Sequence, residues 1–134
     1  VLTNLGVASA ISAFAAKVNM MRGILIDFRT NMEGERFDTD KEVVIYRSAC
    51  EFINNGMKHS GASRIELELR RDQKIITLQY LDNGRGFDME KLSSEETVGM
   101  GIPNIETRVR SVDGVFVIES ARGKGTSALI KVDQ

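Results

Sequence analysis

The chain has 134 residues, of which 42% are hydrophobic and 28% charged, with a formal net charge of -1 at pH 7. That size and apolar content suffice for one domain with its own core, and the absence of a long basic run argues against nucleic-acid binding. The single cysteine, Cys50, excludes an internal disulfide and fits a reducing compartment.

No apolar run approaches the ~18 residues that cross a bilayer, and no signal peptide opens the sequence. Because the chain begins at Val1 without Met and enters a helical pattern almost directly, we expect a piece excised from a longer protein. This piece is expected to be soluble and to face the cytosol.

Hydrophobic periodicity and turn residues divide the chain into alternating elements. In order, the predicted elements are a helix at 7–22, a strand at 23–29, a helix at 41–59, strands at 64–70 and 74–81, an irregular segment at 82–101, a helix at 102–112, and strands at 115–120 and 126–132. Asp38, Thr39 or Asp40 can cap the second helix, and Pro103 suits the first turn of the third. Residues 71–73 are expected to link a hairpin.

Hairpins outnumber crossovers in this order, so the sheet should be mixed and mainly antiparallel. Three amphipathic helices then favour a two-layer α/β sandwich of the α+β class, with the helices on one face. No repeat or domain boundary is visible, so residues 1–134 are expected to form one domain. The irregular segment is longer than most loops, which favours a binding loop or lid at approximately 85–101.

The helix at 41–59 carries an unusual polar face. At 100° per residue its side chains fall in one stripe, opposite an apolar stripe; the polar stripe holds Arg47, Glu51, Asn54, Asn55 and Lys58. Such groups can hold a metal ion and phosphate oxygens, although a solvated, charge-paired face is the plainer alternative. His59 at the end of this helix is expected to have a structural or supporting role, because no second His or Cys cluster exists for zinc.

Three glycine-containing segments follow. Asp82-Asn83-Gly84-Arg85-Gly86 leaves a strand, and a simple turn explains neither its second glycine nor the long segment after it. Gly99-Met100-Gly101 precedes a helix, where backbone N–H groups suit phosphate, with a flexible hinge as the alternative. Gly123-Lys124-Gly125-Thr126 lacks the P-loop spacing and joins two strands, so it is expected to be a hairpin turn with Thr126 facing a pocket.

In this order the segments resemble the ATP-binding domain shared by sensor histidine kinases and DNA gyrase B, the GHKL superfamily with its Bergerat fold. Glu51-x-x-x-Asn55-x-x-Lys58-His59 resembles the N box, Asp82-x-Gly84-x-Gly86 the G1 box, Gly99-x-Gly101 the G2 box, and Gly123-x-Gly125-Thr126 the last glycine motif. The variant motifs are similar to those of NarX/DesK-like sensor kinases. The match covers nearly the whole chain.

The resemblance implies ATP and Mg²⁺ as cofactors and a role for each matching residue. Asp82 would accept a hydrogen bond from the adenine amino group, with Gly84 and Gly86 beside the base and Thr126 supporting it. Asn55 would ligate Mg²⁺. The remaining implied phosphate or cofactor contacts are Asn54, Lys58, Gly99, Met100 and Gly101, and Glu51 would be catalytic, polarising a water or the acceptor imidazole.

Two departures stand out. Gly56 replaces the usual alanine inside the N-box helix, at a cost of about 0.5–1 kcal/mol, which only close approach of another element would explain. No upstream helix carries an acceptor histidine, so this chain could bind ATP but not phosphorylate itself.

The expected function is therefore that of a two-component histidine kinase domain, presenting Mg·ATP to a histidine on a separate dimerisation domain. Its partners would be that domain and a response regulator, and the parent protein can be anchored in the cell membrane. Two alternatives remain: an anti-sigma-factor-type serine kinase, or a non-catalytic interaction module with the same fold.

Overall fold

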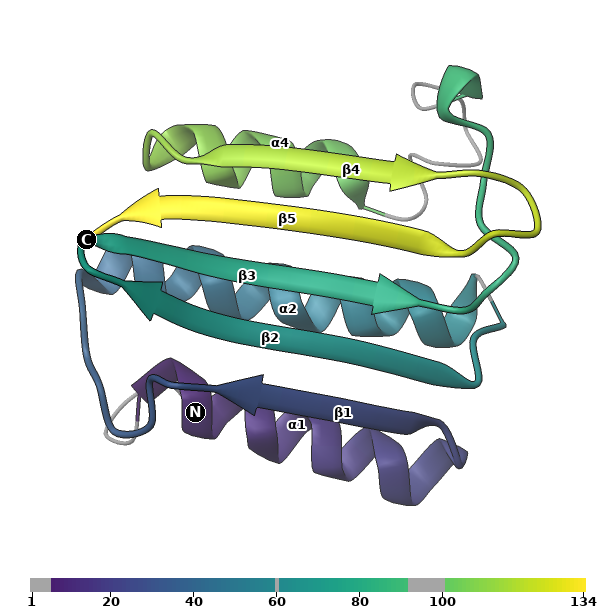
Figure 1. Cartoon of the computed structure of the whole chain (residues 1–134), viewed down its shortest axis with the longest axis horizontal. Coiled ribbons are helices and arrows are strands. Elements are labelled where there is room, and N and C mark those ends of the chain that lie inside the picture. Colours follow the sequence, from purple (N-terminus) through teal and green to yellow (C-terminus); the bar gives the residue numbers. More distant parts are fainter. Residues whose placement is uncertain (1–5, 60, 92–100) are drawn as a thin grey trace.

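A five-stranded sheet with three α-helices packed on one face makes up the computed structural model, which describes residues 6–59, 61–91 and 101–134 (Figure 1). The elements are α1 (Gly6–Arg22), β1 (Leu25–Thr30), α2 (Thr39–Lys58), β2 (Arg64–Asp72), β3 (Ile75–Asp82), the short 3-10 helix η1 (Met89–Lys91), α4 (Ile102–Ser111), β4 (Val115–Ser120) and β5 (Thr126–Asp133).

The strand order is β1-β2-β3-β5-β4. Strand β1 pairs with β2 in parallel, and the β2–β3, β3–β5 and β4–β5 pairs are antiparallel. The mixed, mainly antiparallel sheet and the two-layer arrangement predicted from the sequence are confirmed.

Strict alternation of side chains places one face of the sheet in the core. In β2 and β3 the inward residues are at most 2% exposed; they are Ile65, Leu67, Leu69, Ile76, Leu78 and Tyr80. The predicted link between these strands is wrong in position, because the ladder continues to the Asp72–Ile75 pair and leaves a turn at Gln73 and Lys74. Gln73 has φ +57°, the left-handed conformation that fits a two-residue turn to the twist of a hairpin.

Helix α2 packs its apolar face on the sheet, as its periodicity predicts. Ile45, Ala49 and Ile53 are at most 1% exposed on this face. Asp38 occupies the N-cap position, but its side chain makes no capping hydrogen bond. The segment entering the helix is held by Glu42 instead, whose carboxylate accepts a hydrogen bond of 3.1 Å from the Phe37 amide.

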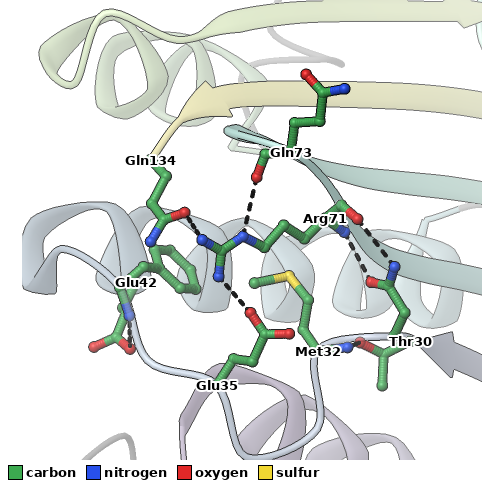
Figure 2. Close-up of polar contacts among 9 residues, drawn as sticks. Thr30, Met32, Glu35, Glu42, Arg71, Gln73 and Gln134 are labelled. Carbon is green, nitrogen blue, oxygen red and sulfur yellow. Dashed lines mark hydrogen bonds and ion pairs between the residues drawn. The ribbon is translucent and has the colours of Figure 1, made fainter.

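The two ends of the sandwich have different roles. At the right-hand end of Figure 1 the last turn of α2, the end of β3, the start of β5 and the first turn of α4 come together. The opposite end is tied by Arg71 (Figure 2), whose guanidinium donates to the Glu35 carboxylate at 2.5 Å and to the side-chain oxygen of Gln134. Asn31 exchanges two hydrogen bonds with the Arg71 backbone, at 2.8 and 3.0 Å.

No helix in the described part of the chain is both long and apolar enough to span a membrane.

Candidate nucleotide site

A pocket opens where the last turn of α2, the end of β3, the start of β5 and the first turn of α4 meet. It is lined by Phe52, Asn55, His59, Tyr80, Asp82, Gly86, Phe87, Ile102, Ile118 and Thr126. Asp82 at the end of β3 and Asn55 on α2 therefore face one space, as the sequence analysis requires. Half of the lining residues are aromatic or aliphatic, and the polar side chains among them converge from different elements, which is the usual make-up of a small-molecule site.

The Asp82 carboxylate is held by two donors. The Gly84 amide donates to Oδ1 at 2.9 Å, and the Tyr80 hydroxyl donates to Oδ2 at 2.6 Å. Tyr80 is 1% exposed, and its burial, together with the nearby Asp82 charge, raises the pKa of its phenol well above the usual range. The phenol therefore stays protonated and remains a donor.

Loop packing explains the second glycine after Asp82, Gly86. Gly86 has φ +67°, and a Cβ there would overlap the Ala121 carbonyl and lie 2.8 Å from the Gly125 carbonyl oxygen. Gly125 in turn approaches the Asp82 carbonyl so closely that a Cβ would overlap it. The β4–β5 hairpin turn thus packs directly on the loop after β3, and the two glycine motifs form one wall of the cavity.

Thr126 belongs to a closed set of hydrogen bonds around Ser120. The Ser120 hydroxyl accepts from the Phe87 amide at 2.8 Å and lies 3.0 Å from the Gly125 carbonyl oxygen and 2.9 Å from Thr126 Oγ1. If Ser120 donates to the Gly125 carbonyl, the Thr126 proton goes to Ser120, and the Thr126 lone pairs remain available as acceptors.

The polar face of α2 points to the same end of the molecule, but its residues differ in placement. Asn55 lines the cavity. Glu51 lies against Gly101, the N-cap of α4 with φ +73°, where a Cβ would overlap the Glu51 carboxylate. Asn54 is half-buried and Lys58 exposed, and neither is among the residues that line the cavity. Gly99 and Met100 lie outside the described residues.

Gly56 has the close neighbour that its place in a helix demands. A Cβ at this position would overlap the Tyr80 hydroxyl and lie 2.8 Å from Ile65 Cδ1. The expectation that another element approaches here is confirmed, and that element is the β2–β3 sheet face.

Two further residues have supporting positions. His59 lines the cavity, and its backbone carbonyl accepts a hydrogen bond from Arg85 Nε at 2.7 Å. Cys50 is half-buried, and burial raises the pKa of its thiol, while a hydrogen bond with Tyr46 opposes the rise. A raised thiol pKa disfavours the thiolate, which agrees with a structural rather than a nucleophilic cysteine.

Sequence reasoning missed the residues that support the predicted ones. Tyr80 and Ser120 hold Asp82 and Thr126, and Phe52, Phe87 and Ile118 supply apolar walls. Tyr80 had one signal in the sequence: it stands two residues before Asp82, among the aliphatic residues of the inward face of β3.

The residues present fit a magnesium ion held jointly with phosphates. Among the described residues no group of three His, Cys, Asp or Glu side chains is placed to hold a metal. Magnesium usually keeps water and substrate phosphates with one or two protein oxygens, and the carboxamide oxygen of Asn55 can serve as such a ligand.

Comparison with known proteins agrees with this geometry. Residues 40–134 match the family described as histidine kinase-, DNA gyrase B- and HSP90-like ATPase. The sensor histidine kinase ComP of Bacillus subtilis (strain 168) is 36% identical over 132 residues, which is 98% of this chain and 17% of ComP. The signal transduction histidine-protein kinase/phosphatase DegS of Brevibacillus brevis is 27% identical over 131 residues, covering 98% of this chain and 33% of DegS. The chain thus spans between a sixth and a third of the length of these relatives.

Solved structures share the fold. The catalytic domain of histidine kinase ThkA aligns with a TM-score of 0.72 and 17% identity, over 95% of this chain and 88% of that one. The histidine kinase domain of the blue-light activated kinase EL346 from Erythrobacter litoralis aligns with a TM-score of 0.71 and 16% identity, over 95% of this chain and 60% of that one. The chain therefore belongs to the histidine kinase-, DNA gyrase B- and HSP90-like ATPase family.

Proposed function

We propose that this chain holds Mg·ATP in the cavity between α2 and the end of β3, and presents the γ-phosphoryl group to a histidine on a separate dimerisation domain of its parent protein. The observation that carries the proposal is that Asp82 and Asn55 line one cavity. A carboxylate that accepts from an amine and a carboxamide that can ligate a metal then lie at the two ends of one nucleotide.

The adenine end is formed by Asp82. One oxygen is bound by Gly84 and the other by Tyr80, and each carboxylate oxygen has a further lone pair for the adenine amino group. Guanine carries an oxygen at that position and would face a second acceptor. Thr126 adds another acceptor on the same side, and the half-buried and buried side chains of Phe87, Ile102 and Ile118 offer apolar surface to the purine faces.

The triphosphate end lies toward α2 and the first turn of α4. Asn55 would ligate Mg²⁺, and bound Mg²⁺ supplies charge neutralisation for the β- and γ-phosphates. Lys58 and Asn54 would meet phosphate oxygens. The backbone amides of Gly99, Met100 and Gly101 would bind the outer phosphates, aided by the positive end of the α4 dipole.

The transfer step needs positioning more than covalent help from this chain. A nitrogen of the acceptor imidazole would attack the γ-phosphorus as the bond to the β–γ bridging oxygen breaks and ADP leaves. Glu51 would orient or deprotonate the imidazole, because its carboxylate lies at Gly101, beside the proposed phosphate amides. The phosphoryl group would then pass to a response regulator, and the domain would act on the cytosolic side of the membrane.

Calorimetric titration with Mg·ATP tests the site. We expect Asp82→Asn to weaken ATP binding by a factor of roughly 10 to 150, which is the contribution of a hydrogen bond to a charged group. The asparagine amide either presents an N–H donor to the adenine amine or accepts its hydrogen bond without a negative charge. Asp72→Asn is the matched control, since Asp72 is exposed at the far end of β2. Unchanged affinity in Asp82→Asn would refute the site, and no heat with the unaltered chain would favour the non-catalytic module.

A further inference from the structure

We propose that Tyr80 is a positioning residue for adenine recognition, orienting Asp82 through its buried hydroxyl, and that Gly56 is a glycine because that hydroxyl occupies the place of its Cβ. The inference rests on the proposed function, because it assumes that adenine is read by Asp82. It adds two residues that none of the four sequence motifs assigns to this task.

The Gly84 amide orients only one of the two oxygens of the Asp82 carboxylate. The second torsion of an aspartate has a broad energy profile, so one donor leaves the plane of the carboxylate loosely defined. The Tyr80 hydroxyl binds the other oxygen at 2.6 Å, while the Gly84 amide binds the first at 2.9 Å. With the Tyr80 hydroxyl on one oxygen and the Gly84 amide on the other, the plane of the carboxylate has a defined orientation.

Tyr80 is itself rigidly placed. Its ring stacks on Phe52 of α2 with centroids 5.2 Å apart and an interplanar angle of 30°, and the residue is 1% exposed. In the β2–β3 ladder it lies opposite Leu67, which is also buried. Because the phenol stays protonated in this setting, the hydroxyl can only donate to the carboxylate.

Gly56 makes this arrangement possible. A Cβ there would overlap the Tyr80 hydroxyl and lie 2.8 Å from Ile65 Cδ1. Glycine is unfavourable inside a helix. Its presence in the last turn of α2 therefore needs a local reason, and the hydroxyl supplies one. Asn55, the proposed Mg²⁺ ligand, is the preceding residue, so the close crossing of α2 and β3 also sets the distance between the two ends of the site.

The test compares two nucleotides. ITP carries an oxygen where ATP carries the amino group, so it has no donor at that position for Asp82. In displacement titrations of a fluorescent ATP analogue with Mg²⁺ present, we expect Tyr80→Phe to weaken ATP binding about 3- to 10-fold and to change ITP binding little. The ratio of ATP to ITP affinity should therefore fall. Tyr46→Phe, at the chain's other tyrosine, should leave the ratio unchanged.

A purely structural role would lower both affinities together, and an unchanged ratio in Tyr80→Phe would overturn the inference. If Asp82→Asn binds ATP normally, the proposed nucleotide site is refuted. If Asp82→Asn binds ATP more weakly but Tyr80→Phe leaves the ratio of ATP to ITP affinity unchanged, only the positioning role of Tyr80 is refuted. Gly56→Ala should also lower the ratio. Its loss of thermal stability should be smaller in a Tyr80→Phe background, where the hydroxyl is absent; equal losses in both backgrounds would contradict the assignment of Gly56.

Discussion

Glu42 offers a test of how the end of the domain opposite the cavity is held together. It is 1% exposed and lies on the first turns of α2, and its carboxylate accepts from Arg36 at 2.8 and 3.0 Å and from the Phe37 amide at 3.1 Å. Figure 2 shows Glu42 at the same end of the sandwich as Arg71. Replacing Glu42 with Gln keeps the size and one acceptor but removes the charge.

The expected loss follows from the difference between charged and neutral hydrogen bonds. Hydrogen bonds to charged groups contribute about 1.5–3 kcal/mol and neutral ones about 0.5–1.5 kcal/mol, so weakening the two bonds from Arg36 should lower the free energy of unfolding by about 2 kcal/mol. For a domain of this size that corresponds to a fall in Tm of roughly 6–10 °C. Nucleotide affinity should stay the same, because the cavity is at the other end.

The pH dependence gives an independent check. The hydrogen bond from Arg36, with further support from the Phe37 amide, lowers the pKa of Glu42 below its usual value although burial opposes the shift. A carboxyl with a lowered folded-state pKa stabilises the fold above its unfolded pKa of about 4.3 and loses this contribution as pH falls further. The Tm difference between the unaltered chain and Glu42→Gln should therefore be full at pH 7 and shrink below about pH 4.3.

Thermal melts followed by circular dichroism measure both effects. Glu106→Gln is the control, because the Glu106–Arg110 ion pair is exposed (side chains 44% and 77%) and such pairs contribute only about 0.3–0.5 kcal/mol. Glu42→Gln and Glu106→Gln melting at the same temperature at pH 7 would refute the reasoning.

Two other outcomes follow from the site and its helix. Asn55→Ala should remove the enhancement of ATP binding by Mg²⁺, seen by calorimetry with and without the ion, because the carboxamide oxygen is lost; persistence of the full enhancement would exclude Asn55 as a ligand. Cys50 should react with a thiol reagent at pH 8 more slowly in the folded chain than in urea, because burial raises its pKa; equal rates would contradict that environment.

Hydrophobic periodicity predicted the helices and strands well where an element buries only one of its faces. Helix α2 was expected at 41–59 and spans Thr39–Lys58, because its apolar stripe has a clear 3.6-residue period. The β2–β3 turn was misplaced because its geometry depends on Gln73 adopting a left-handed conformation. A glutamine in the sequence does not predict that conformation. The absent side-chain cap at Asp38 likewise depends on Glu42 binding the Phe37 amide from within the helix.

The candidate site was predictable as far as its motifs reach. Asp82, Asn55, Thr126 and Gly86 face one cavity, and each lies in a motif that the sequence displays. The supporting contacts were not predictable, because the Tyr80–Asp82 hydrogen bond and its clearance at Gly56 depend on where α2 crosses β3. A linear sequence shows that a helical glycine is unusual, but not which side chain fills the space beside it.

The central claim is that adenine and the metal-bound triphosphate occupy the two ends of one cavity. Titrating the ¹⁵N-labelled chain with adenosine, and then with Mg·ATP, tests it most directly by nuclear magnetic resonance. We expect adenosine to shift the amides of Asp82, Gly84 and Thr126, and Mg·ATP to shift these together with Asn55 and its α2 neighbours. Shifts by Mg·ATP confined to another part of the molecule, such as the groove between α1 and β1 lined by Ser12 and Thr30, would contradict the account.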